Sequence, residues 1–297
     1  MTLFSGLSAF PITPADRHGR VDVSALGALL ARLTDAKVDS IGLLGSTGTY
    51  AYLSREERRR AIDAALAQVG DRMPVMVGIG ALRTDDAVRL GQDAKAAGAA
   101  AGLLAPVSYT PLTEDEVFTH FETVARQVDL PLCIYNNPAT TRFTFSVDLI
   151  ARLSRLPNIV AVKNPAPPAE AAAANLSELR GKVPAGFSIG FSTDWNATEA
   201  LIAGGDAWYS VLAGLFPRPC MDIRSAVRRG DITEARRLNA ALRPLWDLFT
   251  EFSSLRVIYA AVNLLGLCHA EPPRPILPLG EAARDRAADV LRSLDLV

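Results

Sequence analysis

Residues 158–165 read Asn-Ile-Val-Ala-Val-Lys-Asn-Pro, with an unbroken run of four apolar residues at positions 159–162. A strand with one face in water alternates in polarity, whereas a parallel strand covered on both faces is apolar throughout. Seven other short runs are mostly apolar, and they lie at Leu7–Phe10, Ser40–Leu44, Pro74–Ile79, Gly102–Ala105, Leu132–Tyr135, Phe187–Gly190 and Ala207–Val211. The sequence therefore predicts eight buried parallel strands.

Helical patterns separate these apolar runs. Val23–Ala36, Glu56–Val69 and Asp115–Val128 carry apolar residues at helical spacing. Ser54 and Thr113 stand just before the second and third of them, and both are residue types that favour the N-cap of a helix. Strand starts recur roughly every 20 to 35 residues, which is the length of one strand–helix unit.

Eight such units predict a closed (β/α)8 TIM barrel over residues 1–217. A doubly wound open sheet is the alternative, because a single sequence fixes strand topology poorly. Residues 218–297 contain no further clear strand, and we expect them to form a C-terminal helical segment packed on the barrel. The helices expected there are Cys220–Arg229, Thr233–Ser253, Arg256–Leu265 and Glu281–Asp295.

Composition excludes several classes of protein. The 297 residues are 49% hydrophobic, and 31 basic against 32 acidic side chains argue against a nucleic-acid partner. No apolar run approaches the length of a membrane span, and Met1–Ser5 does not read as the start of a secretion signal. The three cysteines form no CxxC pair and the three histidines have no metal-ligand spacing. We therefore expect a cytoplasmic α/β enzyme without a metal site.

The second apolar run ends in Gly45-Ser46-Thr47-Gly48. In a barrel, reactive groups lie at the carboxyl ends of the strands and in the loops that follow. Two glycines let this backbone turn tightly and direct N–H groups at one anionic oxygen. An ordinary strand-to-helix turn uses the same residue types, so the motif alone is a weak signal.

Lys163 directly follows the apolar residues of the sixth run, which puts it at the predicted barrel mouth. Burial of an amine lowers its pKa and increases the neutral, nucleophilic fraction. The alternative is a strand-end lysine whose amine reaches solvent. The chain has only four lysines against 27 arginines, which favours a special role for this one.

Tyr135 ends the fifth run, on the strand expected next to that of Lys163. A phenol beside an amine and a hydroxyl can carry protons through carbonyl addition, although a packed aromatic is the common fate of such a residue.

Gly186–Gly190 matches the GxSxG motif of serine hydrolases around Ser188. That motif requires a strand before the serine and a helix immediately after it, whereas here the match itself forms the expected strand. Because Walker A and GxGxxG sequences are also missing, we expect neither a serine hydrolase nor a nucleotide cofactor.

Taken together in this order and spacing, four segments resemble the dihydrodipicolinate synthase/N-acetylneuraminate lyase family of class I aldolases. They are Gly45–Gly48, Tyr135–Pro138, Ile159–Lys163 and Gly204-Gly205. The resemblance runs from Phe4 to the C-terminal helices. It implies a (β/α)8 barrel with a C-terminal helical extension, assembled as a homodimer or homotetramer, that needs no cofactor.

The resemblance also implies catalytic roles. Lys163 matches the lysine that forms a Schiff base with pyruvate or another 2-keto acid, Tyr135 the tyrosine that relays protons, and Ser46 its hydroxyl partner. Thr47 and Gly48 match the turn that holds the keto-acid carboxylate, and Tyr209 falls where the family uses a backbone carbonyl.

Three positions depart from the family pattern. Thr49 replaces the glutamate that follows the glycine motif. The tyrosine that reaches a neighbouring subunit aligns with Ser108, although Tyr109 is adjacent. The arginine that binds the carboxylate of the second substrate aligns with Thr140, while Arg142 lies two positions on.

We therefore expect a Schiff-base lyase or aldolase that acts on pyruvate or a related 2-keto acid, with an aldehyde as a possible second substrate. The alternatives are a 4-hydroxy-tetrahydrodipicolinate synthase proper and a keto-deoxy sugar acid dehydratase. A barrel kept for ligand sensing or assembly is a weaker alternative, because a fold does not guarantee an activity.

Overall fold

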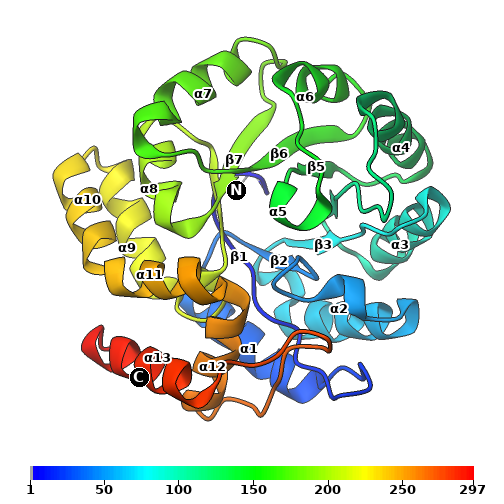
Figure 1. Ribbon diagram of the computed structural model, residues 1–297. Helices are drawn as coiled ribbons and strands as arrows, with labels where there is room; N and C mark the ends of the chain where they lie inside the picture. The colour runs from blue at the N-terminus through cyan, green and yellow to red at the C-terminus, as the bar shows by residue number, and fades with distance from the viewer. Residues whose placement is uncertain (1–2) are drawn as a thin grey trace.

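Eight parallel strands form a closed barrel in the computed structural model, which describes residues 3–297 (Figure 1). Met1 and Thr2, the first residues of the segment that does not read as a secretion signal, lie outside these residues. The strands follow one another round the barrel in chain order. They are β1 (Gly6–Ala9), β2 (Ser40–Leu43), β3 (Val75–Gly78), β4 (Ala101–Leu104), β5 (Leu132–Tyr135), β6 (Ile159–Pro165), β7 (Ser188–Ser192) and β8 (Ala207–Ser210).

The pairing of the first strand with the last closes the barrel. β1 and β8 are parallel, with a register that runs from Gly6 opposite Ala207 to Ala9 opposite Ser210. The prediction of a (β/α)8 barrel is thereby confirmed, and the open-sheet alternative is wrong because an open sheet leaves two strands unpaired at its edges.

β6 is longer than its apolar run. The sequence predicts a strand that stops at Val162, but the strand continues to Pro165, which pairs with Ser192 of β7. Lys163 pairs with Tyr135 of β5 and with Gly190 of β7. Lys163 therefore lies within the strand rather than after it.

Helices surround the barrel and connect its strands (Figure 1). Up to β8 they are α1 (Val23–Ala36), α2 (Arg55–Val69), α3 (Thr84–Ala97), α4 (Glu114–Gln127), α5 (Pro138–Thr141), α6 (Val147–Leu153), α7 (Ala172–Arg180) and α8 (Asp194–Ile202), with 3-10 turns η1 (Tyr50–Tyr52), η2 (Gly70–Arg72) and η3 (Ala169–Ala171). The N-cap signals act as expected. Ser54 accepts the N–H of Glu57, and Thr113 forms a reciprocal capping box with Glu116.

The chain after β8 is helical. It forms η4 (Leu212–Gly214), α9 (Pro217–Arg228), α10 (Ile232–Ala241), α11 (Arg243–Phe252), α12 (Ser254–Leu264) and α13 (Glu281–Ser293). The prediction of one helix over Thr233–Ser253 is wrong, because the helix breaks at Leu242. Pro244 causes the break, since it has no N–H to donate and its ring clashes with the preceding turn. Pro244 instead lies in the first turn of α11, where neither defect matters.

The C-terminal helices are continuous with the barrel. α9 packs against β1, α1 and α8, and α10 packs on α8 and α9. α11, α12 and α13 contact one another, and α11 also contacts α8. The division at residue 217 stays a prediction. Among residues 3–297, no helix is long and apolar enough to cross a membrane.

Two hydrophobic layers support the fold. The outer layer lies between the strands and the helices, and the inner layer fills the barrel. The inner layer includes Phe10, Met76, Leu103, Cys133 and Tyr209. These side chains form a floor beneath the carboxyl ends of the strands.

Candidate active site

A cavity of about 640 Å³ opens at the carboxyl ends of the strands. Its wall combines the loops after β2, β5, β6 and β7 with the junction between α11 and α12. Five of the residues predicted from the sequence line it, and they are Ser46, Thr47, Tyr135, Thr140 and Lys163. The fold thus brings together side chains that lie up to 117 positions apart in the chain.

Lys163 projects from β6 onto aromatic rings and is only 3% exposed. Its Nζ lies 3.8 Å from the ring centroid of Phe10, 4.4 Å from that of Tyr135 and 6.0 Å from that of Tyr209. The ring faces attract a cation electrostatically and replace part of its lost hydration. In the described chain, ion pairs join Lys95 and Lys182 to carboxylates but leave Lys163 without one.

Tyr135 stands at the centre of a polar relay. Its hydroxyl lies 2.7 Å from the Oγ of Ser46 and accepts a hydrogen bond of 2.9 Å from the Nδ2 of Asn137. Because the ring of Tyr135 also faces the Lys163 amine, one phenol joins the amine to a serine hydroxyl. Such a chain can move a proton to or from a substrate held at Lys163.

The turn after β2 is packed closely. A side chain at Gly45 would meet the ring of Phe10 at 2.7 Å, and one at Gly48 would meet the backbone of Leu44 at 3.0 Å. Glycine at these positions lets the turn approach the floor of the cavity and directs Thr47 into it. Gly48 itself is buried and does not line the cavity, so its part in substrate binding stays a prediction.

Other predicted residues lie away from the cavity. Tyr109 is 97% exposed, and Arg142 is an exposed residue in a left-handed conformation at the end of α5. The ring of Tyr209 is buried in the barrel, where its hydroxyl lies 3.8 Å from the Sγ of Cys133. None of these three lines the cavity, and the roles expected for Tyr109 and Tyr209 stay predictions.

Cys133 is the only cysteine near Lys163 among the described residues, and it is fully buried. Burial raises the pKa of its thiol to about 12. Cys133 therefore remains protonated at neutral pH, and it belongs to the barrel floor rather than to the reacting groups.

The polar residues of the cavity wall that sequence reasoning missed include Asn137, Asp194 and Arg256. Asn137 belongs to the Tyr135–Pro138 motif, so the sequence places it near the site. The sequence does not show that its side chain contacts the hydroxyl of Tyr135. Asp194 accepts the Nε1–H of Trp208 and the N–H of Leu212, each at 2.8 Å, and its burial raises the pKa of the carboxyl group.

Ser188 of the GxSxG match lies inside β7, and its Oγ donates to the carbonyl of Phe4 at 2.6 Å. The sharp strand-to-helix turn of a nucleophile elbow does not occur there. The serine hydrolase reading therefore has no support at this position.

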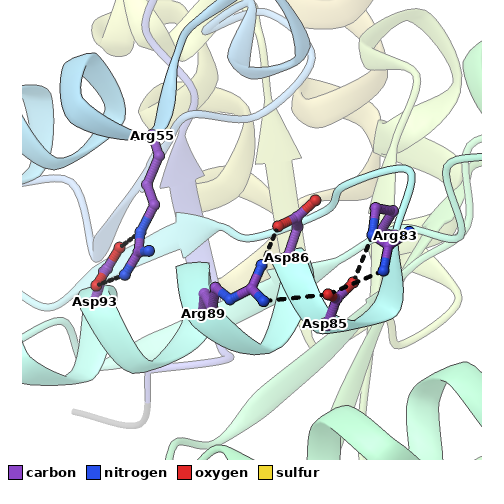
Figure 2. A network of polar contacts seen from close by, with 6 residues as sticks. All are labelled: Arg55, Arg83, Asp85, Asp86, Arg89 and Asp93. Atoms are coloured by element: carbon purple, nitrogen blue, oxygen red, sulfur yellow. Dashed lines mark hydrogen bonds and ion pairs between the residues drawn. The ribbon is translucent and has the colours of Figure 1, made fainter.

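A second, more open groove of about 840 Å³ lies along α3 and α4, but its charges are already paired. Figure 2 shows the network beside it, in which Arg83 and Arg89 bind Asp85, Arg89 also binds Asp86, and Arg55 binds Asp93. Paired and exposed charges of this kind describe a solvated helix surface rather than a reactive centre.

Comparisons with known proteins agree over nearly the whole chain. The model of the dihydrodipicolinate synthetase family matches residues 3–294. A 4-hydroxy-tetrahydrodipicolinate synthase from Pseudomonas putida (strain W619) is 34% identical over 291 residues, which cover 98% of both chains.

Two solved structures extend this likeness to three dimensions. Dihydrodipicolinate synthase from Agrobacterium tumefaciens str. C58 has 58% identity and a TM-score of 0.96, with 98% of both chains covered. The chloride-inhibited dihydrodipicolinate synthase from Acinetobacter baumannii, solved with pyruvate, has 28% identity and a TM-score of 0.91. That match covers 99% of this chain and all of the other.

Proposed function

The chain belongs to the dihydrodipicolinate synthetase family, and on that premise we propose that Lys163 forms a Schiff base with pyruvate or a related 2-keto acid. The protein is a Schiff-base-forming lyase of the class I aldolase type. One observation carries the assignment to Lys163. Its amine is buried in the cavity against Tyr135, whose hydroxyl is bonded to Ser46.

The reaction follows from the chemistry of an amine and a ketone. The unprotonated Nζ of Lys163 adds to the keto carbon, and loss of water gives an imine whose protonated form withdraws electrons from the adjacent carbon. That carbon loses a proton to give an enamine, which attacks an aldehyde. In the reverse direction, a carbon–carbon bond breaks and leaves the same enamine.

Tyr135 and Ser46 supply the proton transfers of these steps. The Tyr135 hydroxyl protonates the departing oxygen and recovers a proton through Ser46, while Asn137 holds the phenol in place. Thr47, buried in the turn after β2, is the proposed contact for the keto-acid carboxylate. Pyruvate suits this arrangement, and the Acinetobacter relative was solved with pyruvate.

The second substrate distinguishes the remaining alternatives. Thr140 stands where the resemblance implies an arginine, and one hydroxyl binds a carboxylate far more weakly than a bidentate guanidinium does. We therefore expect slow condensation of pyruvate with aspartate semialdehyde and faster cleavage or dehydration of another 2-keto acid. The alternatives remain a 4-hydroxy-tetrahydrodipicolinate synthase proper and a keto-deoxy sugar acid dehydratase.

Assembly and location belong to the same proposal. We propose a homodimer or homotetramer, in which the almost fully exposed Tyr109 reaches a neighbouring subunit. A monomer at micromolar concentration, measured by light scattering, would contradict this. A cytoplasmic location agrees with three free cysteines, as expected in a reducing compartment.

A steady-state panel tests the reaction. Pyruvate is offered with aspartate semialdehyde and with neutral aldehydes, and keto-deoxy sugar acids are offered alone. We expect turnover of at least one substrate set, and a slow reaction of the semialdehyde. A kcat/KM for the semialdehyde of about 10⁴–10⁵ M⁻¹s⁻¹, within the ordinary range of enzymes, would instead establish the synthase alternative.

A further inference from the structure

Arg256 enters the cavity from outside the barrel. It lies in the first turn of α12, whose sequence Ser-Leu-Arg-Val-Ile-Tyr-Ala-Ala-Val-Asn-Leu contains no other charged residue. The side chain is half-buried and lines the same cavity as Lys163. A single cation on an otherwise uncharged helix is not needed for solubility, and its position at the cavity wall points to a ligand.

The guanidinium of Arg256 is held in place but not neutralised. Its Nε donates to the carbonyl of Leu277 at 3.2 Å, and its Nη1 lies 3.5 Å from the carbonyl of Phe252. Across residues 3–297, the side chain of Arg256 donates to these two carbonyls and no carboxylate forms an ion pair with it. A guanidinium has five N–H donors, so Nη2 retains both of its donors for a planar anion.

Nearby acidic groups do not satisfy this cation. Asp194 is the only carboxylate that lines the cavity within the described chain, and both of its oxygens already accept hydrogen bonds from Trp208 and Leu212. Lys163 and Arg256 are the cations of this wall. The cavity is therefore suited to a substrate that carries negative charge beyond the group bound at Lys163.

The backbone that presents Arg256 is strained. Ser253, at the junction of α11 and α12, has φ 74° and ψ 132°, a conformation that is costly for a residue with a side chain. This junction places Ser253, Ser254 and Arg256 together in the cavity wall. Strain of this kind persists where the surrounding structure enforces it, and such positions cluster at ligand sites.

We propose that Arg256 binds a carboxylate at the far end of the substrate whose keto group is held at Lys163. Thr140, which follows β5, cannot supply a cation for this carboxylate. Arg256 would supply that cation from the C-terminal helices instead. This inference rests on the Schiff base proposed for Lys163. Arg142 is a poor substitute, because it is exposed and does not line the cavity.

Matched keto acids test the proposal without knowledge of the natural substrate. 2-Oxoglutarate and 2-oxopentanoate have the same number of carbons, and both present a keto acid to Lys163, but only the first carries a distal carboxylate. 2-Oxoadipate and 2-oxohexanoate repeat the comparison with one more carbon. The affinity of each is measured from borohydride trapping as a function of concentration, in wild type, Arg256→Gln, Arg256→Lys and the control Arg142→Ala.

We expect wild type and Arg142→Ala to trap at least one dicarboxylate about 10- to 100-fold more tightly than its partner, as for a charge-assisted hydrogen bond. Arg256→Gln should remove this preference and Arg256→Lys should keep part of it, while all variants trap pyruvate equally. Equal trapping of pyruvate shows that each variant is folded. Failure of pyruvate trapping in wild type would instead contradict the proposed function.

Two results would overturn the assignment to Arg256. One is wild-type enzyme that shows no preference for either dicarboxylate. The other is a preference for the dicarboxylate that persists in Arg256→Gln. If Arg142→Ala then removes that preference, Arg142 rather than Arg256 binds the distal carboxylate.

Discussion

The arginines of α2 and α3 and the two cations of the cavity have opposite surroundings. Arg55, Arg83 and Arg89 are exposed, and each is joined to a nearby aspartate (Figure 2). Lys163 is buried against aromatic rings and Arg256 is half-buried against carbonyls, and neither forms an ion pair with a carboxylate of the described residues.

The comparison distinguishes two kinds of charged side chain. The first kind keeps a helix surface hydrated, and the second kind has no protein counter-charge and is available to bind a ligand. Exposed pairs gain little because water already solvates both partners. Taking a cation even partly out of water without a counter-charge costs free energy, so its presence at a cavity needs another reason. At Lys163 and Arg256, we infer that the substrate provides the missing partners.

The largest effect is expected from removal of the amine. Lys163→Met keeps an unbranched side chain against Phe10 and removes the nucleophile. We expect kcat/KM to fall roughly 10³-fold or more, with a cooperative thermal transition retained. The matched control is Lys182→Met, since Lys182 is exposed and paired with Asp148, and it should leave kcat/KM unchanged. Comparable losses in both variants would remove the distinction between the two regions.

A smaller effect is expected from the loss of one hydroxyl. Tyr135→Phe keeps the ring over the Lys163 amine and removes the relay to Ser46. Turnover should fall about 10²-fold, which is the scale of general acid–base catalysis, while the protein stays folded. Tyr259→Phe is the control, because Tyr259 is a buried tyrosine that does not line the cavity. Unchanged turnover in Tyr135→Phe would reduce Tyr135 to a packed aromatic.

His120 of α4 extends the comparison, because it is partly buried and has one unpaired ring nitrogen, but it lines neither the cavity nor the groove along α3 and α4. Its Nδ1 lies 3.0 Å from the Oγ1 of Thr84, its Nε2 has no partner, and burial lowers its pKa to about 4. The unfolded chain takes up this proton near pH 6.5, whereas the folded chain does so only near pH 4. Acid therefore favours unfolding between these values.

We expect this group to remove roughly 2 kcal/mol of stability between pH 7 and pH 5. The measurement is urea unfolding at both pH values for wild type and for His120→Gln, which cannot titrate. The variant should lose less stability on acidification. An identical pH dependence of the two proteins would show that His120 is protonated in the folded state as easily as in the unfolded one.

The smallest effect is expected on the helix surface. Arg89→Ala removes the ion pairs with Asp85 and Asp86, which water solvates in any case. We expect a change in Tm within about 2 °C and no change in turnover. A drop in turnover would mean that the charges along α3 and α4 affect the reaction in the cavity.

Much of this account could be predicted from local sequence. The eight apolar runs specify buried strands, and the N-cap residues Ser54 and Thr113 mark helix starts, because both signals act over a few residues. Pro244 is a helix-breaking residue that the sequence shows directly. The amphipathic pattern continues on both sides of it, however, and therefore predicted one helix where the structure has α10 and α11.

The rest depends on contacts between distant parts of the chain. Nothing near residue 256 indicates that α12 will face the loops after β2 and β5, since only the folded barrel brings them together. The bond between Tyr135 and Ser46 spans 89 residues, and only the resemblance to a known family suggested it.

The central claim is that the buried and unpaired Lys163 is the nucleophile. Its most direct test is incubation with pyruvate and borohydride, followed by mass spectrometry of the intact chain and of its peptides. We predict one pyruvate-derived group per chain, located on the peptide that contains Lys163 and missing from Lys163→Met. A group on the peptide of Lys182, or labelling that persists in Lys163→Met, would contradict the account.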